Sequence, residues 1–340
     1  CRNFLRKKEI RMIIDPRIID FLSTKHKILI TTHVRPDGDA IGSSLALMHF
    51  LRKKGHYVML TFPSIFADYH KWFPGVEDAL IYPHKKGSVE TFLKNTDLII
   101  AVDFNDLKRN ADLGKYLAEL EIPKLMIDHH PEPDTSFTYE VWSTKYCAAG
   151  EAVFDLINAI DETSLMDQTI CTCLYAAIIS DSGSFRYPSV TKRTFEIASK
   201  LLESGIEHSL IQREVYDNFS EKRLRFWGHC VTEKMEFIEE HKAAFISVSK
   251  EDFEKFKTKA SDTENLVNFP MNIKDVIISV LLVEHDGFIK LSFRSKDEFP
   301  VNELAKKYFN GGGHLNAAGG ESKSDMATAI QELRDGLKTL

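Results

Sequence analysis

The sequence has few cysteines, no long apolar run and no excess of basic residues. Its five cysteines in 340 residues form an odd number without the spacing of a disulfide framework, so we expect free thiols in a reducing, cytoplasmic compartment. No apolar stretch reaches the roughly 18 residues of a membrane span, which predicts no membrane association. The net charge of −6 argues against a protein that grips long nucleic acid, but not against small phosphorylated ligands.

The N-terminal segment 1–11 is basic and is not followed by the apolar segment of a secretory signal. We expect no signal peptide there. The sequence leaves open whether Met12 is the natural start with an extension ahead of it.

From Lys27 onward, short apolar segments alternate with helical patterns. The expected strands are residues 27–33, 56–62, 96–104 and 124–130, and the expected helices are residues 40–54, 150–160 and 167–180. Uninterrupted apolar strands separated by helices are typical of a parallel sheet that is covered on both faces. We therefore predict an α/β fold whose first domain has a central, mostly parallel sheet flanked by helices.

The remainder of the chain divides into a helical stretch and a second domain. Gly205 and Ser220 indicate helix ends within the helical stretch. Beyond it, we expect strands at 243–249 and 275–285, a hairpin at Asp286-Gly287 with positive φ at both turn positions, and helices at 301–308 and from about Asp325. The predicted organisation is a catalytic domain (12–190), a helical connection (191–233) and a smaller α/β domain with a mixed sheet (234–340).

Acidic and histidine side chains gather where the apolar segments of the first domain end. The clusters are His33 with Asp37 and Asp39; Asp103; Asp128 with His129 and His130; and Asp181 after the helix 167–180. A single acid at such a place is commonly a helix cap or a turn former. Three such clusters at strand ends and a fourth after a helix are harder to explain in that way, and if they converge, the carboxylates would raise one another's pKa.

Divalent cations would remove the repulsion between these carboxylates. The candidate ligands are His33, Asp37, Asp39, Asp103, His129 and Asp181. A mixed imidazole and carboxylate set without thiolate fits two Mn²⁺ ions best, with Mg²⁺ or Co²⁺ as alternatives. Two such ions about 3.5–4 Å apart activate water and clamp the oxygens of a phosphoryl group.

The segments THVRPDGDAIGS, VDFND, IDHH and SDSGSFR resemble, in this order, the four motifs of the DHH phosphoesterase superfamily. The C-terminal NGGGHLNAAG is similar to the glycine-rich signature of the DHHA1 domain. The ordered set spans residues 32–319, whereas any one motif alone would be a weak signal. Within the superfamily, the length and layout resemble the group of bifunctional oligoribonucleases and pAp phosphatases (nanoRNases).

The resemblance implies a role for each matching residue. His33 and Asp37 would bind one metal ion, Asp39, His129 and Asp181 the other, and Asp103 would bridge the two. His130 would face the substrate as a catalytic residue, and Asp128 would orient a histidine without binding metal. The substrate-binding residues of the second domain would be Arg294, Gly311, Gly312, Gly313 and His314.

The sequence departs from the pattern of the superfamily in two places. Asn310 stands where relatives often have another glycine, and it tolerates left-handed geometry. Phe104, Asn105 and Asp106 stand where small hydroxyl residues are frequent, which puts the surroundings of Asp103 in doubt.

We expect an enzyme that hydrolyses short oligoribonucleotides to mononucleotides and dephosphorylates pAp, with these molecules as its partners and no need for long nucleic acid. The alternatives within enzymes are a phosphodiesterase for linear or cyclic di-adenylates and, further from the motifs, an exopolyphosphatase or pyrophosphatase. A non-catalytic nucleotide-binding module is the alternative from another class, although all six ligand positions are filled. The oligomeric state stays open, and a homodimer is compatible with the sequence.

Overall fold

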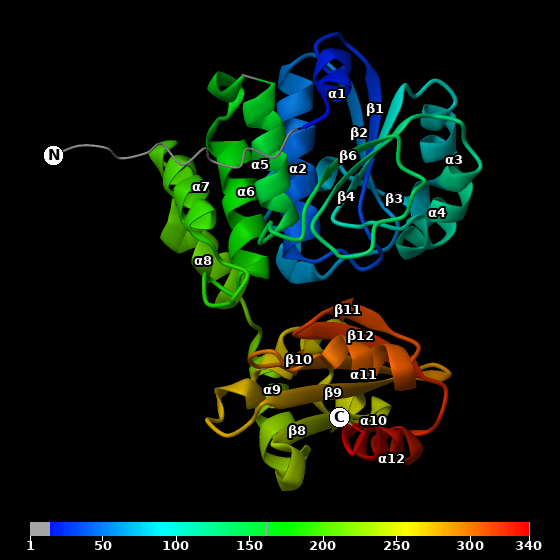
Figure 1. Ribbon diagram of the computed structural model, residues 1–340, viewed down its shortest axis with the longest axis vertical. Coiled ribbons are helices and arrows are strands. Elements are labelled where there is room, and N and C mark those ends of the chain that lie inside the picture. The colour runs from blue at the N-terminus through cyan, green and yellow to red at the C-terminus, as the bar shows by residue number, and fades with distance from the viewer. Residues whose placement is uncertain (1–13, 161, 340) are drawn as a thin grey trace, which may run out of the picture. The chain divides into compact units, whose positions relative to one another are not determined.

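The computed structural model describes residues 14–160 and 162–339, and the chain divides into two compact units, Cys1–Asn218 and Phe219–Leu340. Segment 1–11 and Met12 lie outside the described residues. The division falls within the segment expected to be a helical connection. Of its helices, α7 (Lys192–Glu203) and α8 (His208–Tyr216) belong to the first unit, and α9 (Glu221–Glu233) belongs to the second (Figure 1).

A six-stranded sheet forms the centre of the first unit. Its strands are β1 (Lys27–Thr31), β2 (Tyr57–Phe62), β3 (Leu80–Ile81), β4 (Leu98–Val102), β5 (Lys124–Asp128) and β6 (Tyr139–Trp142). Their order is β3-β2-β1-β4-β5-β6, and every pairing between neighbours is parallel. The predicted parallel sheet is therefore confirmed. The edge strands β3 and β6 were not expected, because they have only two and four residues, too few to show a pattern.

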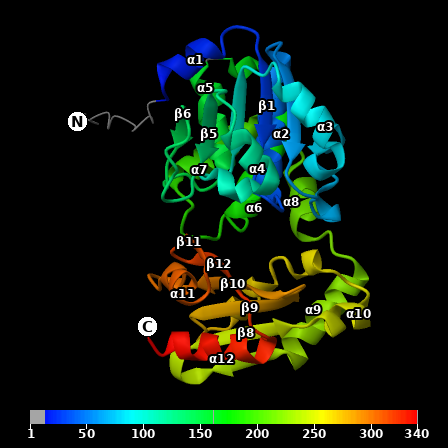
Figure 2. The same cartoon turned by 90° about the vertical axis from the view of Figure 1, so that its right-hand side faces the viewer.

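Helices cover both faces of this sheet. They are α1 (Pro16–Phe21), α2 (Gly38–Lys53), α3 (Tyr82–Leu93), α4 (Ala111–Ala118), α5 (Ala149–Ala159) and α6 (Gln168–Asp181), with α7 and α8 outside α6. One core lies between the sheet and α2, α5 and α6, and a smaller core lies under α3 and α4 (Figures 1 and 2). β4 and β5 are buried along their whole length because both of their faces are covered, and this explains why they read as continuous apolar runs.

The second unit contains a mixed six-stranded sheet, as predicted. Its strands are β7 (Met235–Ile238), β8 (Ala243–Val248), β9 (Ile278–His285), β10 (Phe288–Ser295), β11 (Gly312–His314) and β12 (Ala317–Ser322). The order is β11-β12-β10-β9-β8-β7, and β8 pairs with β9 in parallel whereas the other pairs are antiparallel. Its helices are α9, α10 (Lys250–Phe256), α11 (Val301–Tyr308) and α12 (Met326–Leu337).

The hairpin between β9 and β10 has the expected two-residue turn, but one detail of the prediction is wrong. Gly287 has a φ of 83°, whereas Asp286 is not among the residues with positive φ. The turn therefore needs left-handed geometry at its second position only. The other local predictions are confirmed: the Ser220 hydroxyl caps α9 by accepting a bond from the Arg223 N–H, and Gly205 follows the end of α7 with a φ of 79°.

None of the helices in the described residues combines the length and the apolarity that a membrane span requires.

Candidate metal centre and substrate-binding residues

The sheet of the first unit changes direction between its two central strands. From β1 the chain builds outward through β2 and β3, and from β4 it builds outward in the opposite direction through β5 and β6. In an open parallel sheet, the loops at such a switch point diverge to opposite faces and leave room for a ligand beyond the carboxyl ends of the strands. His33 follows β1 and Asp103 follows β4, so the topology brings their clusters together.

The six candidate ligands form two groups. One group is His33, Asp37 and Asp103, and the other is Asp39, His129 and Asp181; within each group the ligand atoms lie within 4.8 Å of one another. Asp103 lies between the groups. Its Oδ2 is 3.3 Å from the Nε2 of His33, and its Oδ1 is 3.4 Å from the Nε2 of His129.

Asp37 shows that a helix cap and a ligand position are compatible. Its Oδ1 accepts bonds from the N–H groups of Asp39 and Ala40, which caps α2, while its Oδ2 is 3.9 Å from the Nε2 of His33. The Nδ1 of His33 is 2.9 Å from the carbonyl oxygen of Val34. If that bond carries the ring proton, the Nε2 keeps a lone pair directed toward Asp37 and Asp103.

Asp39 is held by the beginning of a neighbouring helix. Its carboxylate accepts bonds from the N–H groups of Ala149 (2.6 Å) and Gly150 (3.1 Å), which open α5, and from the hydroxyl of Ser43 (2.8 Å). Burial raises the pKa of Asp39 well above its ordinary value, and the charges of Asp103 and Asp181 raise it further. The carboxylate is therefore fixed in place but electrostatically unfavourable without a cation nearby.

His129 and Asp181 complete the second group. The Nε2 of His129 is 3.4 Å from Asp181 and 3.8 Å from Asp39. Burial lowers the pKa of His129, but the bond to Asp103 and the charges of Asp181 and Asp39 outweigh it and raise the pKa well above the ordinary value. Asp181 is the last residue of α6 rather than a residue beyond it.

Asp103 is the most constrained residue of the site. It has a φ of 64°, a left-handed conformation that costs a residue with a side chain about 1–3 kcal/mol. Burial raises its pKa, but the imidazoles of His129 and His33 beside it outweigh burial and hold the pKa well below the ordinary value. Its buried Oδ1 receives no well-aligned hydrogen bond from the described residues. A buried carboxylate oxygen without a well-aligned donor, beside three further acids, fits a bound cation.

Asp128 and His130 form a pair beside this centre. Asp128 is fully buried, and its Oδ1 accepts a 2.8 Å bond from the Nδ1 of His130. This bond leaves the Nε2 of His130 as the ring atom that faces away from Asp128. Burial lowers the pKa of His130, and the bond to Asp128 only partly opposes this effect.

Several residues that support the site were not identified from the sequence. Ser43 lies one helical turn after Asp39, so its spacing could have revealed it. Asn105 holds the loop after His130 through a 2.6 Å bond to the carbonyl oxygen of Pro131. In the same segment after Asp103, Phe104 is fully buried and Asp106 caps a short helix, so these residues have structural roles.

The predicted substrate-binding residues lie on the sheet of the second unit. Arg294 in β10 and His314 in β11 are both paired with Ala317 of β12. Because residues directly opposite one another in a sheet project from the same face, Arg294 and His314 share one face. Two strand spacings separate them, which is about 10 Å. Asn310 has a φ of 45°, so it adopts the left-handed geometry expected for it.

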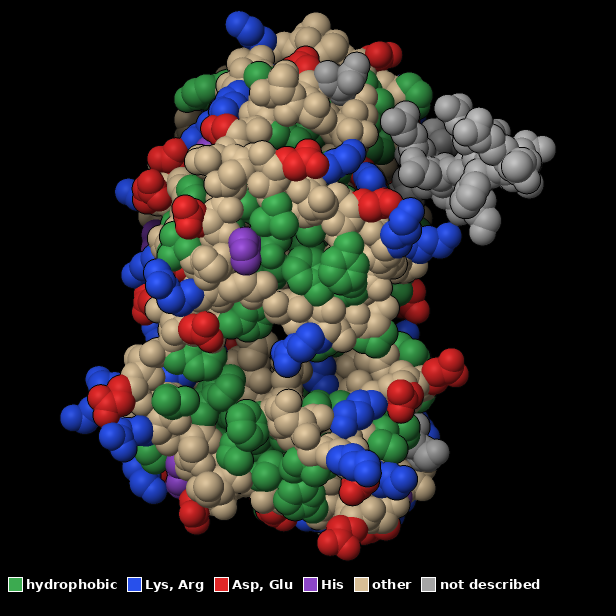
Figure 3. All heavy atoms as spheres, turned by 90° about the vertical axis from the view of Figure 1, so that its left-hand side faces the viewer, with side chains coloured by type: hydrophobic (Ala, Val, Ile, Leu, Met, Phe, Trp, Pro, Cys, Tyr) green, Lys and Arg blue, Asp and Glu red, His purple; other side chains and the backbone are tan. Residues whose placement is uncertain are grey.

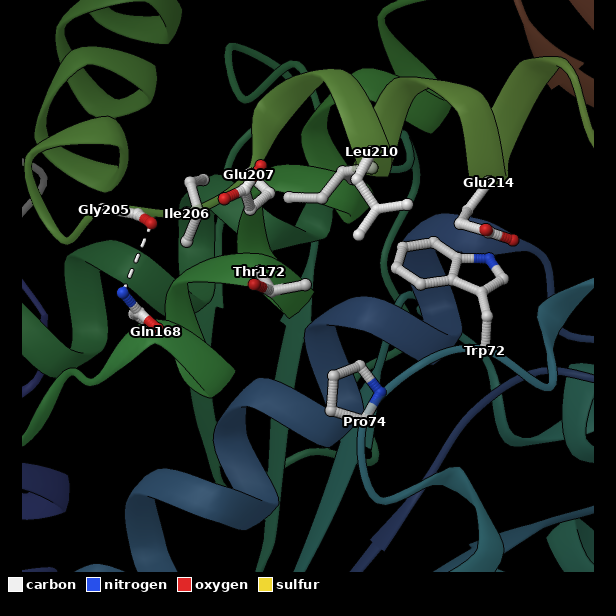
Figure 4. A pocket seen from close by; sticks show the side chains of 10 residues that line it. Trp72, Pro74, Gln168, Thr172, Gly205, Ile206, Glu207, Leu210 and Glu214 are labelled. Carbon is white, nitrogen blue, oxygen red and sulfur yellow. Dashed lines mark hydrogen bonds between the residues drawn. The ribbon is translucent and has the colours of Figure 1, made fainter.

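A cavity of about 320 Å³ lies elsewhere in the first unit. Trp72, Pro74 and Leu210 contribute to its wall, and the amide of Gln168 closes part of it by donating to the carbonyl oxygen of Gly205 (Figure 4). None of the predicted site residues lines this cavity.

Apolar side chains are exposed on the side of the first unit that carries α7 and α8 (Figure 3). Phe195, Leu202 and Leu210 of these helices are 55%, 41% and 41% exposed. This surface is separate from the predicted site, since no predicted site residue belongs to either helix.

Comparison with known families gives two matches. The profile of the DHH family, N-terminal domain, matches residues 27–178, and the DHHA1 domain matches residues 242–339. The chain is 31% identical to the "probable bifunctional oligoribonuclease and PAP phosphatase NrnA" of Streptococcus mutans, over 92% of this chain and 95% of the relative. It is 30% identical to the "bifunctional oligoribonuclease and PAP phosphatase NrnA" of Bacillus subtilis, over 89% of this chain and 91% of that protein.

Solved structures agree with these matches. A crystal structure of an exopolyphosphatase-related protein from Bacteroides fragilis is similar with a TM-score of 0.91 and 37% identity, covering 96% of this chain and 97% of the other. The Thermus thermophilus RecJ structure in complex with Mn²⁺ has a TM-score of 0.54 at 13% identity, covering 95% of this chain and 53% of that one, which is a likeness of fold.

Proposed function

The chain belongs to the DHH family, and from this membership we propose that it is a two-metal phosphoesterase. It would hydrolyse short oligoribonucleotides to mononucleotides and remove a phosphate from pAp. The observation that carries this proposal is the pair of ligand groups that meet at Asp103, whose two carboxylate oxygens face His33 and His129.

The first ion would be held by His33 and Asp37, and the second by Asp39, His129 and Asp181, with Asp103 shared between them. We propose Mn²⁺ for both, because oxygen and imidazole ligands without thiolate suit it, with Mg²⁺ or Co²⁺ as alternatives. When bound, such ions lower the pKa of water and stabilise negative charge on phosphoryl oxygens. The raised pKa of Asp39, which burial and neighbouring acids cause, supports a cation at this place.

Besides holding the ions, the protein would position the phosphoryl group and the leaving oxygen. Water adds to phosphorus, and the bond from phosphorus to the leaving sugar oxygen breaks. His130, which Asp128 holds through its Nδ1, would present its Nε2 to the phosphoryl group or to the leaving oxygen. The proton lost by the attacking water ends on the leaving sugar hydroxyl, directly or through the solvent.

Arg294, the glycine run and His314 would bind the terminal phosphate or the nucleotide end of the substrate. The common face of Arg294 and His314 supports this assignment, because two cationic or hydrogen-donating groups about 10 Å apart can engage one nucleotide. The fork of the arginine suits phosphate especially well.

We place the activity in the cytoplasm, in agreement with the four described cysteines, which are free and buried.

Two other phosphoryl substrates have support from relatives. The chain is 24% identical to the cyclic-di-AMP phosphodiesterase PdeA of Listeria monocytogenes but spans only 48% of that protein. The similar Bacteroides fragilis protein is described as exopolyphosphatase-related. Both substrate classes therefore belong in the same assay.

The test measures product formation from pApA, a five-nucleotide RNA, pAp, cyclic di-AMP and polyphosphate, with Mn²⁺ and with a chelator. Asp103→Asn removes the shared charge while keeping the shape of the side chain. Asp112→Asn is the matched control, because Asp112 is 84% exposed and only pairs with Lys115 on the surface.

We expect release of mononucleotides and of phosphate from pAp with Mn²⁺ and with the control variant. The chelator removes the ions, and Asp103→Asn removes the charge and one of the two oxygens of the shared ligand. In both cases the rate should fall by a factor of about 10³ or more. Faster turnover of polyphosphate than of any nucleotide would refute the proposed substrate class. Undiminished turnover by Asp103→Asn would refute the two-metal site.

A further inference from the structure

Arg109 lies beside the candidate metal centre, on the short 3-10 helix Leu107–Asn110. Its Nη2 is 3.4 Å from the Nε2 of His130, the ring atom that Asp128 leaves available. Neither composition nor motif spacing pointed to this residue. Its position follows from how the loop after Asp103 folds back over the end of β1.

Hydrogen bonds fix this loop against the end of β1. The carbonyl oxygen of Arg109 accepts a 2.9 Å bond from the N–H of Val34, the residue after His33. The amide of Asn110 donates to the hydroxyl of Thr31 at 2.9 Å and to the carbonyl oxygen of Thr32 at 2.5 Å. The backbone that carries the Arg109 side chain is therefore hydrogen-bonded to segment 31–34, which also contains the candidate ligand His33.

The guanidinium of Arg109 lies close to acidic residues without pairing with any of those that the structure describes. Within the described residues, no carboxylate forms an ion pair with it, although Asp128 and Asp103 lie 2.8 Å and 3.7 Å from the Nδ1 of His130, the histidine that it contacts. The side chain is half-buried, so its charge is only partly screened by water. A guanidinium held in this way at a site for phosphoryl groups is suited to an anionic ligand, because its fork matches two phosphate oxygens.

We propose that Arg109 is a catalytic residue that donates to a non-bridging oxygen of the scissile phosphoryl group, on the side where His130 lies. The inference rests on the proposed phosphoesterase function. Arg109 would then supply a donor to the phosphoryl group beside the Nε2 of His130. Negative charge that develops on that oxygen in the transition state strengthens the contact, which is how a fixed cation accelerates such a reaction.

Arg109 could instead serve only to offset the nearby carboxylates or to orient His130. The two functions differ in what they predict. A residue that merely offsets negative charge would weaken metal binding, so its removal should tighten Mn²⁺ binding and leave turnover unchanged. A residue that merely orients His130 should lose its effect once His130 is absent.

The experiment compares Arg109→Ala and Arg109→Lys with Lys108→Gln as the matched control. Lys108 is on the same short helix, but its side chain is 88% exposed and lies 3.5 Å from Asp106. The kcat and KM for pApA are measured with Mn²⁺, and Mn²⁺ affinity is measured separately by calorimetry. The same substitutions are repeated in a His130→Ala background. The two diastereomers of pApA with sulfur at the scissile phosphate are tested as substrates.

We expect Arg109→Ala to lower kcat/KM by a factor of about 10²–10³, the range typical of a lost transition-state donor. Arg109→Lys should recover part of that loss, Lys108→Gln should match the wild type, and Mn²⁺ affinity should not fall. The loss should persist in the His130→Ala background. It should be smaller with the one diastereomer in which sulfur replaces the oxygen that Arg109 contacts.

Wild-type activity in Arg109→Ala, or a loss that disappears in the His130→Ala background, would overturn the proposal while leaving the proposed function intact. A wild-type protein that hydrolyses none of the nucleotide substrates would refute the proposed function, and the role of Arg109 would fall with it. The two failures are therefore distinguished by the wild-type measurement.

Discussion

The glycine run of the second unit offers a sharp test, because its three glycines meet different surroundings. A Cβ atom at Gly311 would lie 2.0 Å from the carbonyl oxygen of Gly319 in the facing strand β12. At Gly313, where φ is 142°, a Cβ would lie 2.5 Å from the carbonyl oxygen of Ala317. At Gly312 a Cβ would meet no atom within 4 Å. Two of the glycines are thus required by strand packing, and only Gly312 is left free to approach a ligand.

The expected cost of an alanine at each position follows from these distances. Gly311→Ala and Gly313→Ala must push β11 away from β12, so we expect each to destabilise the second unit by roughly 3 kcal/mol, the upper end for overpacking. Gly313→Ala also forces a side chain into a backbone conformation that suits only glycine. Gly312→Ala should be neutral or stabilise the unit by up to about 1 kcal/mol, because it restricts the unfolded chain.

Urea unfolding monitored by amide hydrogen exchange in β12 measures these differences in the full chain. Enzyme assays on the folded Gly312→Ala variant then test the ligand contact, for which we expect a rise of about tenfold or more in the KM for pAp, equivalent to about 1.4 kcal/mol. A Gly311→Ala variant as stable as the wild type would refute the packing argument. An unchanged KM in Gly312→Ala would mean that the glycine run serves only the packing of β11 on β12.

Three further predictions concern the metal centre and the second unit. Ser43→Ala removes a donor to Asp39, so calorimetry should show Mn²⁺ affinity reduced by roughly 10- to 100-fold, and unchanged affinity would exclude an orienting role for the hydroxyl. Each Mn²⁺ ion that binds at 100 times its Kd should stabilise the first unit by about 2.7 kcal/mol and raise its Tm by roughly 5–11 °C in calorimetric scans, an effect that a chelator reverses and Asp103→Asn abolishes. The pKa of Asp252 is lowered to about 2, because bonds from the Ser249 N–H and from His229 outweigh the effect of burial. The stability that its carboxylate contributes is therefore present above about pH 4 and is lost as the pH falls toward 2. Asp252→Asn should remove about 1–2 kcal/mol of this pH dependence in urea unfolding. If the free energy of unfolding of the variant changed with pH as it does in the wild type, the assignment would be contradicted.

The sequence by itself determined the fold class and the residue types of the site. β4 and β5 could be recognised because both faces of these strands are covered, which makes every residue apolar. Several short elements were not predicted, because they have too few residues to show a period: the strands β3, β6 and β11 and the helix α10. The positive φ predicted for Asp286 failed for a related reason: a two-residue signal fixes the position of a turn more firmly than its type.

Only the tertiary structure decided how the site residues are arranged. The sequence placed acids and histidines at strand ends, but the strand order put the ends of β1 and β4 side by side and set Asp103 between His33 and His129. Two contacts of the site had no signature in the sequence. The backbone N–H groups at the start of α5 that bind Asp39 could not be predicted, because every residue except proline has such a group. Arg109 beside His130 could not be predicted either, because a single arginine forms no motif. Periodicity reports the surroundings that repeat along one element, whereas these contacts join elements that meet only in the folded chain.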